Sequence, residues 1–373
     1  MNEMESKMSL LSSLTSTTTQ STIADESIVD DMWFRVLKYT LYAIMFLISL
    51  PGNLMVCLVI TRRQKMKTIT NFLILNIAVS DVLYTIYVPV DIVIIESKSW
   101  PYADFFCNIF YPLMTLSICV SALTLMALAL SRFWAVVFPL RRQVSVLQVK
   151  ILLVVIWLLS IIQVLPYAIV LHVSSESTQC DELWPSEENK KIYTVILFLL
   201  QFVIPLTAIT FAYTMVGLEL KKSSRKTNNQ VLEQTRNEES KKIIRMLVIV
   251  TLTFAFCNLP TSTMWMIKDF GSINIAGFDD IIPFFNILDF ANAAANPCIY
   301  LACNEDFRRE FRRYLTKLRR KINWSSQQMN DRSSPSRKSY EQQEKTTADE
   351  VSVANTNLDP TSSMLVKTSE SSL

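Results

Sequence analysis

Long uninterrupted apolar stretches constrain this chain more than any other feature. A helix rises about 1.5 Å per residue, so roughly 20 apolar residues are needed to cross a hydrocarbon core about 30 Å thick. Half of the residues are hydrophobic and only 18% are charged, against about 25% charged residues in a typical soluble domain. The chain is therefore expected to form one membrane domain with seven transmembrane helices, at about 39–60, 69–95, 105–130, 147–171, 192–216, 243–267 and 281–302.

The loops between these stretches indicate which side of the membrane each faces, because lysine and arginine concentrate on the cytosolic side. The loop near Trp100 offers only Lys98, whereas the loops after the first, third and fifth stretches are basic. We therefore expect a multi-pass protein of the plasma membrane with an extracellular N-terminus and a cytosolic C-terminus. The basic loop residues are Arg62, Arg63, Lys65, Lys67, Arg141, Arg142, Lys221, Lys222, Arg225, Lys226, Lys241 and Lys242.

The composition divides the chain into four segments. Residues 1–34 are rich in serine and threonine, lack the apolar run of a cleaved signal peptide, and are expected to be disordered and extracellular. The seven-helix domain covers residues 35–303. Residues 304–321 are expected to form a cytosolic helix. Residues 322–373 are polar and are expected to be a disordered cytosolic tail.

The segment 304–321 has the periodicity of an amphipathic helix. Phe307, Phe311, Leu315 and Leu318 recur at helical spacing, opposite a row of basic side chains. Such a helix lies on the inner membrane face, although a solvated basic helix without a lipid role has the same pattern. The expected fold is an all-α membrane protein, a seven-transmembrane helix bundle with a short amphipathic helix eight. The basic side chains are Arg308, Arg309, Arg312, Arg313 and Lys317.

The cysteines are distributed unevenly along the chain. Cys107 and Cys180 both fall on the expected extracellular side, where a disulfide forms and persists. We therefore predict a Cys107–Cys180 disulfide, which would hold the second outer loop over the helical bundle. The remaining cysteines lie in or at the ends of apolar stretches and are most simply core residues: Cys57, Cys119, Cys257, Cys298 and Cys303.

An ionisable side chain inside a bilayer is costly and is by default functional. Asp81 lies in the middle of the second stretch, and Asn286, Asp289, Asn292 and Asn296 share one face of the seventh. One interpretation is that these groups only hold the helices together. A carboxylate facing several neutral oxygens predicts instead a site for a small hydrated cation.

A series of short motifs follows the helices in a fixed order. The motifs are Gly52-Asn53, NIAVSD ending at Asp81, Trp100, Cys107, Trp157, Pro205 with Tyr213, Pro260, and NPCIY at 296–300. In their order and spacing the chain resembles the rhodopsin-like (class A) G-protein-coupled receptors, over about residues 35–320. The resemblance implies a receptor that passes an extracellular signal to a heterotrimeric G protein.

The resemblance also implies roles for particular residues. Asp81, Ser121, Asn292 and Asn296 match the sodium-binding positions of the family, with Asp81 as the metal-binding carboxylate. Sodium would act as an allosteric modulator, and no other cofactor is expected. Several positions match groups that rearrange on activation, the prolines because each removes a helix hydrogen bond and permits a kink. These positions are Arg132, Tyr213, Phe254, Asn258, Pro260, Pro297 and Tyr300, and Pro205 is a further kink position.

Two switch positions depart from the family pattern. Ser131 replaces the acid that normally precedes Arg132, and Asn258 replaces the tryptophan that normally precedes Pro260 by two residues. We hypothesise that Asn258 hydrogen-bonds Asp289. Neither Ser131 nor Ser240, at the corresponding position of the sixth helix, can neutralise Arg132, so we expect raised activity without ligand. Glu238 and Glu239 are nearby acids that would weaken this expectation.

Subtraction narrows the ligand. Met114 stands where amine receptors of the family carry an aspartate, and Phe290 where opsins carry the retinal lysine. The outer segments are acidic, which favours a basic ligand, although a charged loop also keeps a surface solvated. Together with MKTITNFLILNIAVSD and Asp269, this most resembles the neuropeptide branch of the family. The candidate ligand-binding residues are Asp91, Met114, Asp269 and Asp289, and the further outer acids are Glu176, Asp181, Glu182, Glu187, Glu188, Asp279 and Asp280.

Other partners follow from the termini. The serine- and threonine-rich tail indicates phosphorylation by a receptor kinase and recruitment of arrestin. Ser371-Ser372-Leu373 fits a C-terminal ligand for a PDZ domain. Membrane lipids are expected around the bundle. The net charge of +3 is too small to indicate nucleic acid.

Alternatives from other classes are an orphan or lipid-sensing member of the same family, and a transporter or channel. A transporter commonly shows internal repeats or broken helices, and the sequence shows no repeat. An intramembrane enzyme needs paired catalytic groups, whereas the only histidine, His172, lies at a loop edge. The chain is not expected to be an enzyme.

Overall fold

The structure is a computed structural model that describes residues 2–97, 99–174, 178–226, 231–271, 278–333 and 345–348. Side chains are described at 32–97, 99–174, 178–222, 238–271, 282–321, 323–329 and 345–348. Two compact units are present, Met1–Phe311 and Arg312–Leu373. The helix bundle belongs entirely to the first unit.

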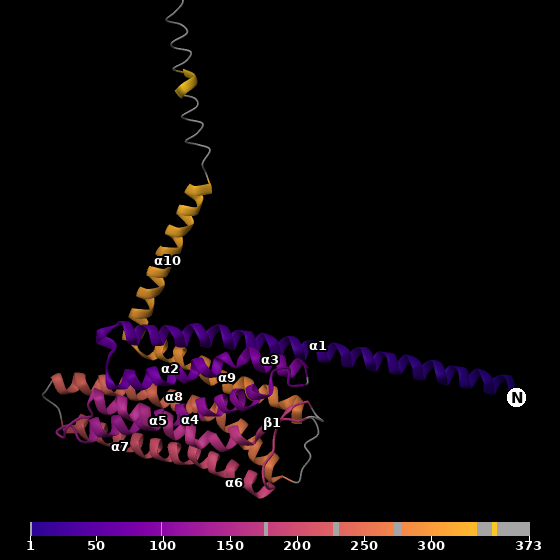
Figure 1. Cartoon of the computed structure of the whole chain (residues 1–373), viewed down its shortest axis with the longest axis horizontal. Helices are drawn as coiled ribbons and strands as arrows, with labels where there is room; N and C mark the ends of the chain where they lie inside the picture. The colour runs from indigo at the N-terminus through magenta and orange to yellow at the C-terminus, as the bar shows by residue number, and fades with distance from the viewer. Residues whose placement is uncertain are drawn as a thin grey trace, which may run out of the picture. The chain divides into compact units, whose positions relative to one another are not determined.

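The bundle is built from long helices connected by short segments (Figure 1). Helix α4 is central, since it contacts α2, α5 and α7, while α9 contacts α1, α2 and α8. The first strand leads out of α5, and a 3₁₀ turn η1 (Gln64–Met66) joins α1 to α2. The helices are α1 (Asn2–Arg62), α2 (Ile69–Ile86), α3 (Val88–Ser97), α4 (Asp104–Val137), α5 (Val146–Val170), α6 (Glu187–Phe198), α7 (Ile204–Lys226), α8 (Val231–Phe270), α9 (Phe278–Cys303) and α10 (Glu305–Ser333).

The expected membrane crossings correspond to these helices. Within the described residues, six spans are long and apolar enough to cross a bilayer. Helix α9 is the seventh helix of the bundle and falls short of that apolarity because it carries Asn286, Asp289, Asn292 and Asn296. The six spans are Met32–Arg62, Ile69–Ser97, Asp104–Val137, Val146–Val170, Glu187–Lys222 and Glu238–Phe270.

Two of the expected crossings are interrupted near a proline. Helix α2 ends at Ile86 and α3 begins at Val88, directly before Pro89, which has no N–H to donate. Between α6 and α7 the chain forms a π-helical segment, η2 (Leu199–Val203), just before Pro205. Pro260 and Pro297 each lie inside a continuous helix, α8 and α9.

Both ends of the bundle's chain differ from expectation. We expected disorder up to residue 34, but the backbone of α1 is helical from Asn2. Residues 2–31 contain neither glycine nor proline, so nothing in this segment breaks a helix. Likewise α10 does not stop near residue 321 but ends at Ser333, two residues before Pro335.

A small β-hairpin was not predicted from the sequence. Strand β1 (Leu171–Val173) pairs antiparallel with β2 (Cys180–Glu182), with Val173 opposite Cys180. The predicted disulfide is confirmed: Cys180 is bonded to Cys107 of α4, with 5.8 Å between the Cα atoms. Among the other cysteines, Cys119 and Cys257 are buried as expected, whereas Cys298 is exposed.

The closest approach between α1 and α9 depends on a glycine. Asn53 donates from Nδ2 to the Ala293 carbonyl at 2.9 Å, which fixes the two helices side by side. One residue earlier, a Cβ atom added to Gly52 would lie 2.7 Å from Cγ and 2.9 Å from Cβ of Pro297. These are rigid ring atoms, so only glycine fits at this position.

Gly52→Ala is therefore expected to lower the free energy of unfolding by about 1–3 kcal/mol, the usual cost of overpacking a core. Gly217 of α7 is the matched control, because a Cβ there would meet nothing within 4 Å. Gly217→Ala should be neutral or stabilising, since alanine favours a helix over glycine. Thermal denaturation of both variants in detergent measures the difference; equal melting temperatures would contradict this account of the α1–α9 contact.

Candidate functional site

A buried polar cluster lies between α2, α4 and α9. Asp81 is 3% exposed and accepts a hydrogen bond from Asn296 Nδ2 at 2.8 Å. The Ser121 hydroxyl is 2.9 Å from that of Ser80. The Oδ1 atoms of Asn292 and Asn296 are both buried without a hydrogen-bond partner among the described residues. A carboxylate together with free carbonyl oxygens is a donor set that fits a small hard cation.

A second acid cluster is closer to the disulfide end of the bundle, by which we mean the end that carries Cys107 and Cys180. Asp91 is 4% exposed and accepts a hydrogen bond from the Tyr42 hydroxyl at 2.6 Å. Asn286 Nδ2 lies 3.4 Å from the same oxygen. This places Asp91 at the junction of α1, α3 and α9.

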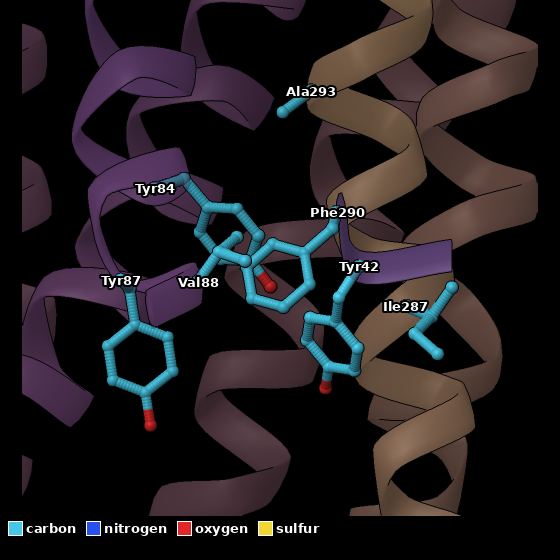
Figure 2. Packing of buried hydrophobic residues seen from close by; sticks show 7 residues of the cluster. All are labelled: Tyr42, Tyr84, Tyr87, Val88, Ile287, Phe290 and Ala293. Carbon is cyan, nitrogen blue, oxygen red and sulfur yellow. The ribbon is translucent and has the colours of Figure 1, made fainter. Parts of the chain in front are cut away.

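Aromatic rings close the space next to Asp91. Figure 2 shows Tyr42 and Tyr84 converging on Phe290 of α9, with ring centroids 5.5 and 5.0 Å from that of Phe290. The candidate residue Met114 packs against the same cluster. The hydroxyl of Tyr84 is buried and has no hydrogen-bond partner among the described residues.

The contact of Asp289 differs from our hypothesis. Asn258 donates from Nδ2 to the Phe254 carbonyl of its own helix at 2.8 Å, and Asp289 Oδ1 accepts from the Thr261 hydroxyl at 2.9 Å. Thr261 lies three residues further along α8 and therefore replaces Asn258 as the partner of Asp289. Phe254 itself stacks on Phe202 of η2, with ring centroids 5.8 Å apart.

Asp269 lies near the last turn of α8, at the disulfide end. Its side chain is 4% exposed, and its Oδ1 is 3.1 Å from Lys190 Nζ of α6. Its Oδ2 accepts a hydrogen bond from the Thr194 hydroxyl at 2.6 Å. The acid that we expected to be free for a ligand is therefore already paired within the protein.

The opposite end of the bundle carries Arg132 and is called the arginine end. Within the described residues, no carboxylate lies within ion-pair distance of Arg132, and its Nε is buried without a hydrogen-bond partner. Ser131 donates to the Leu128 carbonyl at 2.8 Å. Glu238, one of the two nearby acids, pairs with Lys241 at 2.7 Å.

Tyr213 and Tyr300 share this property with Arg132. Each tyrosine has a buried hydroxyl without a hydrogen-bond partner among the described residues. The ring of Tyr300 stacks on Phe307, with centroids 5.8 Å apart. The positions that the family resemblance marks as switches thus carry polar atoms whose hydrogen bonds are not made in this arrangement.

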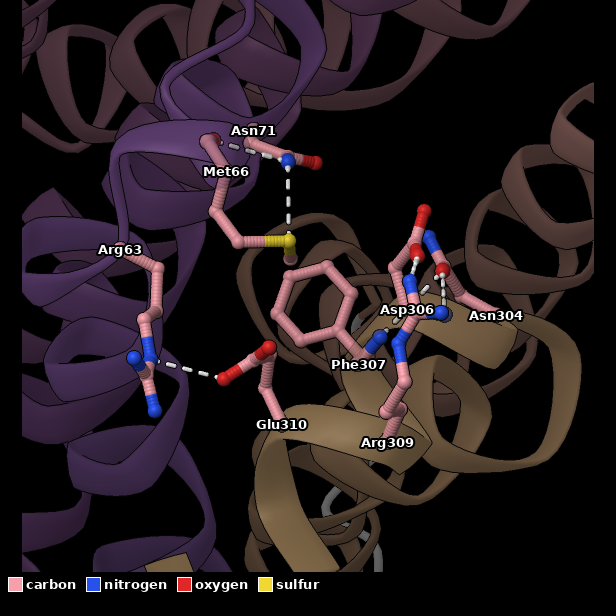
Figure 3. Close-up of polar contacts among 8 residues, drawn as sticks. All are labelled: Arg63, Met66, Asn71, Asn304, Asp306, Phe307, Arg309 and Glu310. Carbon is pink, nitrogen blue, oxygen red and sulfur yellow. Dashed lines mark hydrogen bonds and ion pairs between the residues drawn. The ribbon is translucent and has the colours of Figure 1, made fainter. Parts of the chain in front are cut away.

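The first turns of α10 are fastened to the arginine end (Figure 3). Arg63 Nε is 2.7 Å from Glu310 Oε2, and the Glu310 side chain is largely buried. Asn304 Oδ1 accepts from the backbone N–H of Asp306 at 3.0 Å, which caps the helix. Phe307 is inserted between these contacts and Tyr300.

Comparison with known proteins assigns this arrangement to a family. Residues 52–300 match the 7 transmembrane receptor (rhodopsin family). The chain belongs to this family. It is therefore a class A G-protein-coupled receptor, as the order of its motifs predicted, and its family is one of receptors rather than enzymes.

Similar proteins include several peptide receptors. The chain is 34% identical to neuropeptide FF receptor 2 of Rattus norvegicus over 296 residues, which is 72% of this chain and 70% of the relative. It is 29% identical to neuropeptide FF receptor 1 of Homo sapiens over 291 residues, 72% and 68% of the two chains. It is 30% identical to the RYamide receptor of Tribolium castaneum over 306 residues, 76% and 82% of the two chains.

Sequence reasoning missed the partners of the acids. Tyr42, Thr261 and Thr194 are common residue types inside helices and carry no signal that marks them as partners. Lys190 did carry one, because it is a basic residue inside an otherwise acidic outer segment. Glu310 was also recognisable, as an acid within the basic helix after NPCIY.

The unpaired Arg132 generates a prediction about resting activity. A hydrogen bond to a charged group contributes about 1.5–3 kcal/mol, and each 1.4 kcal/mol changes a two-state ratio about tenfold. The wild-type receptor should therefore turn over G protein without ligand, and Ser131→Asp should reduce this basal turnover about tenfold. Ser131→Asn has the same shape without the charge and should not reduce it. Equal basal turnover in all three, at matched surface expression, would show that other groups hold the resting state.

Proposed function

We propose that this receptor binds a basic neuropeptide from the extracellular side and activates a heterotrimeric G protein in the cytosol. Support comes from its similarity to the neuropeptide FF and RYamide receptors. The observation that carries the proposal is Asp269, a carboxylate held at the disulfide end by α6 and α8. An amidated peptide with arginine near its C-terminus supplies the matching cation.

The disulfide end faces the extracellular side in this proposal. A disulfide persists in an oxidising compartment, and the basic loops after α1 and α4 belong to the opposite, arginine end. The N-terminus is then extracellular, and the tail is cytosolic. The receptor is in the plasma membrane, where a secreted peptide reaches the disulfide end.

Acidic residues surround the entrance on this side and attract a basic ligand during its approach. Glu187 and Glu188 are exposed in the first turn of α6, and Asp181 and Glu182 are half-buried in β2. The other acids that we singled out, Glu176, Asp279 and Asp280, lie outside the described side chains. Asp269 forms the ion pair with the ligand's arginine, and Asp91, Asp289 and Met114 lie deeper in the bundle.

Sodium is proposed as an allosteric modulator of this activity. Asp81, Ser121, Asn292 and Asn296 would hold the ion, which supplies a positive charge that favours the packing of α2 against α9. The unpartnered oxygens of Asn292 and Asn296 support the assignment. Because the ion binds one of two states better, it opposes an agonist that favours the other state.

Lipid and tail partners complete the proposal. Leu315 and Leu318 of α10 are exposed, as a helix lying on a membrane requires. Phosphorylation of the tail by a receptor kinase recruits arrestin, and Thr346 and Thr347 are exposed acceptors in the described part of the tail. The PDZ ligand Ser371-Ser372-Leu373 lies outside the described residues.

The role of Asp269 is tested with a synthetic amidated peptide ending in Arg-Phe-amide. Losing a partly desolvated charge partner costs about 2–5 kcal/mol, so Asp269→Asn should lower potency more than tenfold. Glu188→Gln removes an exposed acid on the same side and should change potency little. A peptide with citrulline in place of arginine should not distinguish Asp269→Asn from wild type. Equal potency of the arginine peptide on both receptors rules out Asp269 as the anchor.

The sodium proposal has its own test. Affinity for the same peptide should be lower in sodium chloride than in an equal concentration of a large organic cation salt, because sodium stabilises the resting packing. Asp81→Asn removes the charge that holds the ion and should abolish the difference. An unchanged wild-type affinity in the two salts would contradict the site.

A further inference from the structure

Asp269 is occupied by a residue of the receptor itself. Lys190 Nζ is 3.1 Å from Asp269 Oδ1, and the Thr194 hydroxyl donates to the other oxygen at 2.6 Å. Lys190 and Thr194 are four residues apart on α6 and therefore present both groups on one face of that helix. An ammonium and a hydroxyl are also what a peptide's basic end would offer to this carboxylate.

Lys190 has a second acid within reach. Its Nζ is 3.9 Å from Glu182 Oε2 of β2, and that oxygen already accepts a hydrogen bond from the Trp184 indole at 2.6 Å. The Lys190 side chain is 24% exposed, whereas that of Asp269 is 4% exposed. Lys190 can therefore leave Asp269 without losing either contact with water or a carboxylate partner. Asp269 cannot lose its cation as cheaply, because a buried charge left unpaired is strongly destabilising.

The pair also connects two helices that are otherwise free to separate at this point. The 12-residue helix α6 is set apart from α7 by the π-helical segment η2, and it contacts α8. Thr194 and Lys190 are its bonds to Asp269 of α8. Whatever replaces Lys190 at Asp269 removes one of these bonds between α6 and α8.

We propose that Lys190 is an internal counter-ion that occupies the ligand's anchor in the resting receptor and is replaced there by the basic group of the ligand. This inference rests on the proposed function, since it requires a cationic ligand at Asp269. The exchange keeps Asp269 paired throughout, moves Lys190 to Glu182, and loosens α6 from α8. Lys190 thereby sets how strongly basic a ligand must be to bind.

The resting pair is tested without any ligand. Thermal stability is measured for wild type, Lys190→Gln, Asp269→Asn and the double variant. The two single changes should each lower the melting temperature, and the double variant should lose clearly less than their sum, because both remove the same ion pair. Lys191→Gln is the control: Lys191 lies over the Phe270 ring at 5.8 Å, and its loss should add to that of Asp269. Additive losses for Lys190 and Asp269 overturn the internal pair.

The exchange is tested with the Arg-Phe-amide peptide. A partly exposed ion pair contributes up to about 1 kcal/mol, and 1.4 kcal/mol is tenfold in binding. Lys190→Gln should therefore raise the potency of the arginine peptide by about three- to tenfold. The citrulline peptide should gain nothing, and Lys191→Gln should leave both potencies unchanged.

The outcomes separate this inference from the proposed function. If Asp269→Asn loses potency while Lys190→Gln equals wild type or is weaker, the exchange is overturned and the anchor stands. If the arginine peptide acts equally on wild type, Lys190→Gln and Asp269→Asn, the anchor is wrong, and the exchange is overturned together with the proposed function.

Discussion

The structure depends first on the need to bond every backbone N–H and C=O group inside the chain, since the hydrocarbon core offers no water to do so. Helices meet this need, and side-chain hydroxyls add to it by returning to their own helix. Thr85 donates to the Asp81 carbonyl at 2.6 Å, and Thr251 donates to that of Leu247 at 2.9 Å. A hydroxyl used in this way is not available to a neighbouring helix. The few polar side chains that do reach across the bundle, such as Asn53 and Thr261, therefore determine which helices move together.

The buried acids of the bundle are held by different kinds of partner at different depths. Asp81 and Asp289 accept from an amide and a hydroxyl, which are neutral donors. Asp269, at the disulfide end, is held by a lysine. A carboxylate satisfied by neutral donors keeps its negative charge, so the interior of the bundle favours a cation. A basic ligand at the disulfide end and sodium at Asp81 both use this field.

The sequence predicted the crossings well, because the length of an apolar stretch is set by the thickness of the bilayer. The interruptions at Tyr87 and η2 follow from Pro89 and Pro205, but a proline does not reveal whether a helix ends, kinks or forms a π turn. Side-chain partners were harder to predict. Asn258 and Thr261 are separated by three residues on α8, and hydropathy does not show which of them points at Asp289. Thr194 and Asp269 are 75 residues apart, and only the folded bundle brings them together.

The two ends of the bundle differ in how completely their polar groups are satisfied. At the disulfide end, a covalent bond and the Lys190–Asp269 pair hold the segments together. At the arginine end, Arg132 Nε and the hydroxyls of Tyr213 and Tyr300 are buried without partners among the described residues. Each unpaired buried group costs about 1–3 kcal/mol, and an arrangement that pairs them recovers this energy. The resting arrangement is thus kept by contacts at the disulfide end and opposed at the arginine end. A small change in free energy near Asp269 is enough to move such a balance, because two-state populations shift about tenfold for each 1.4 kcal/mol.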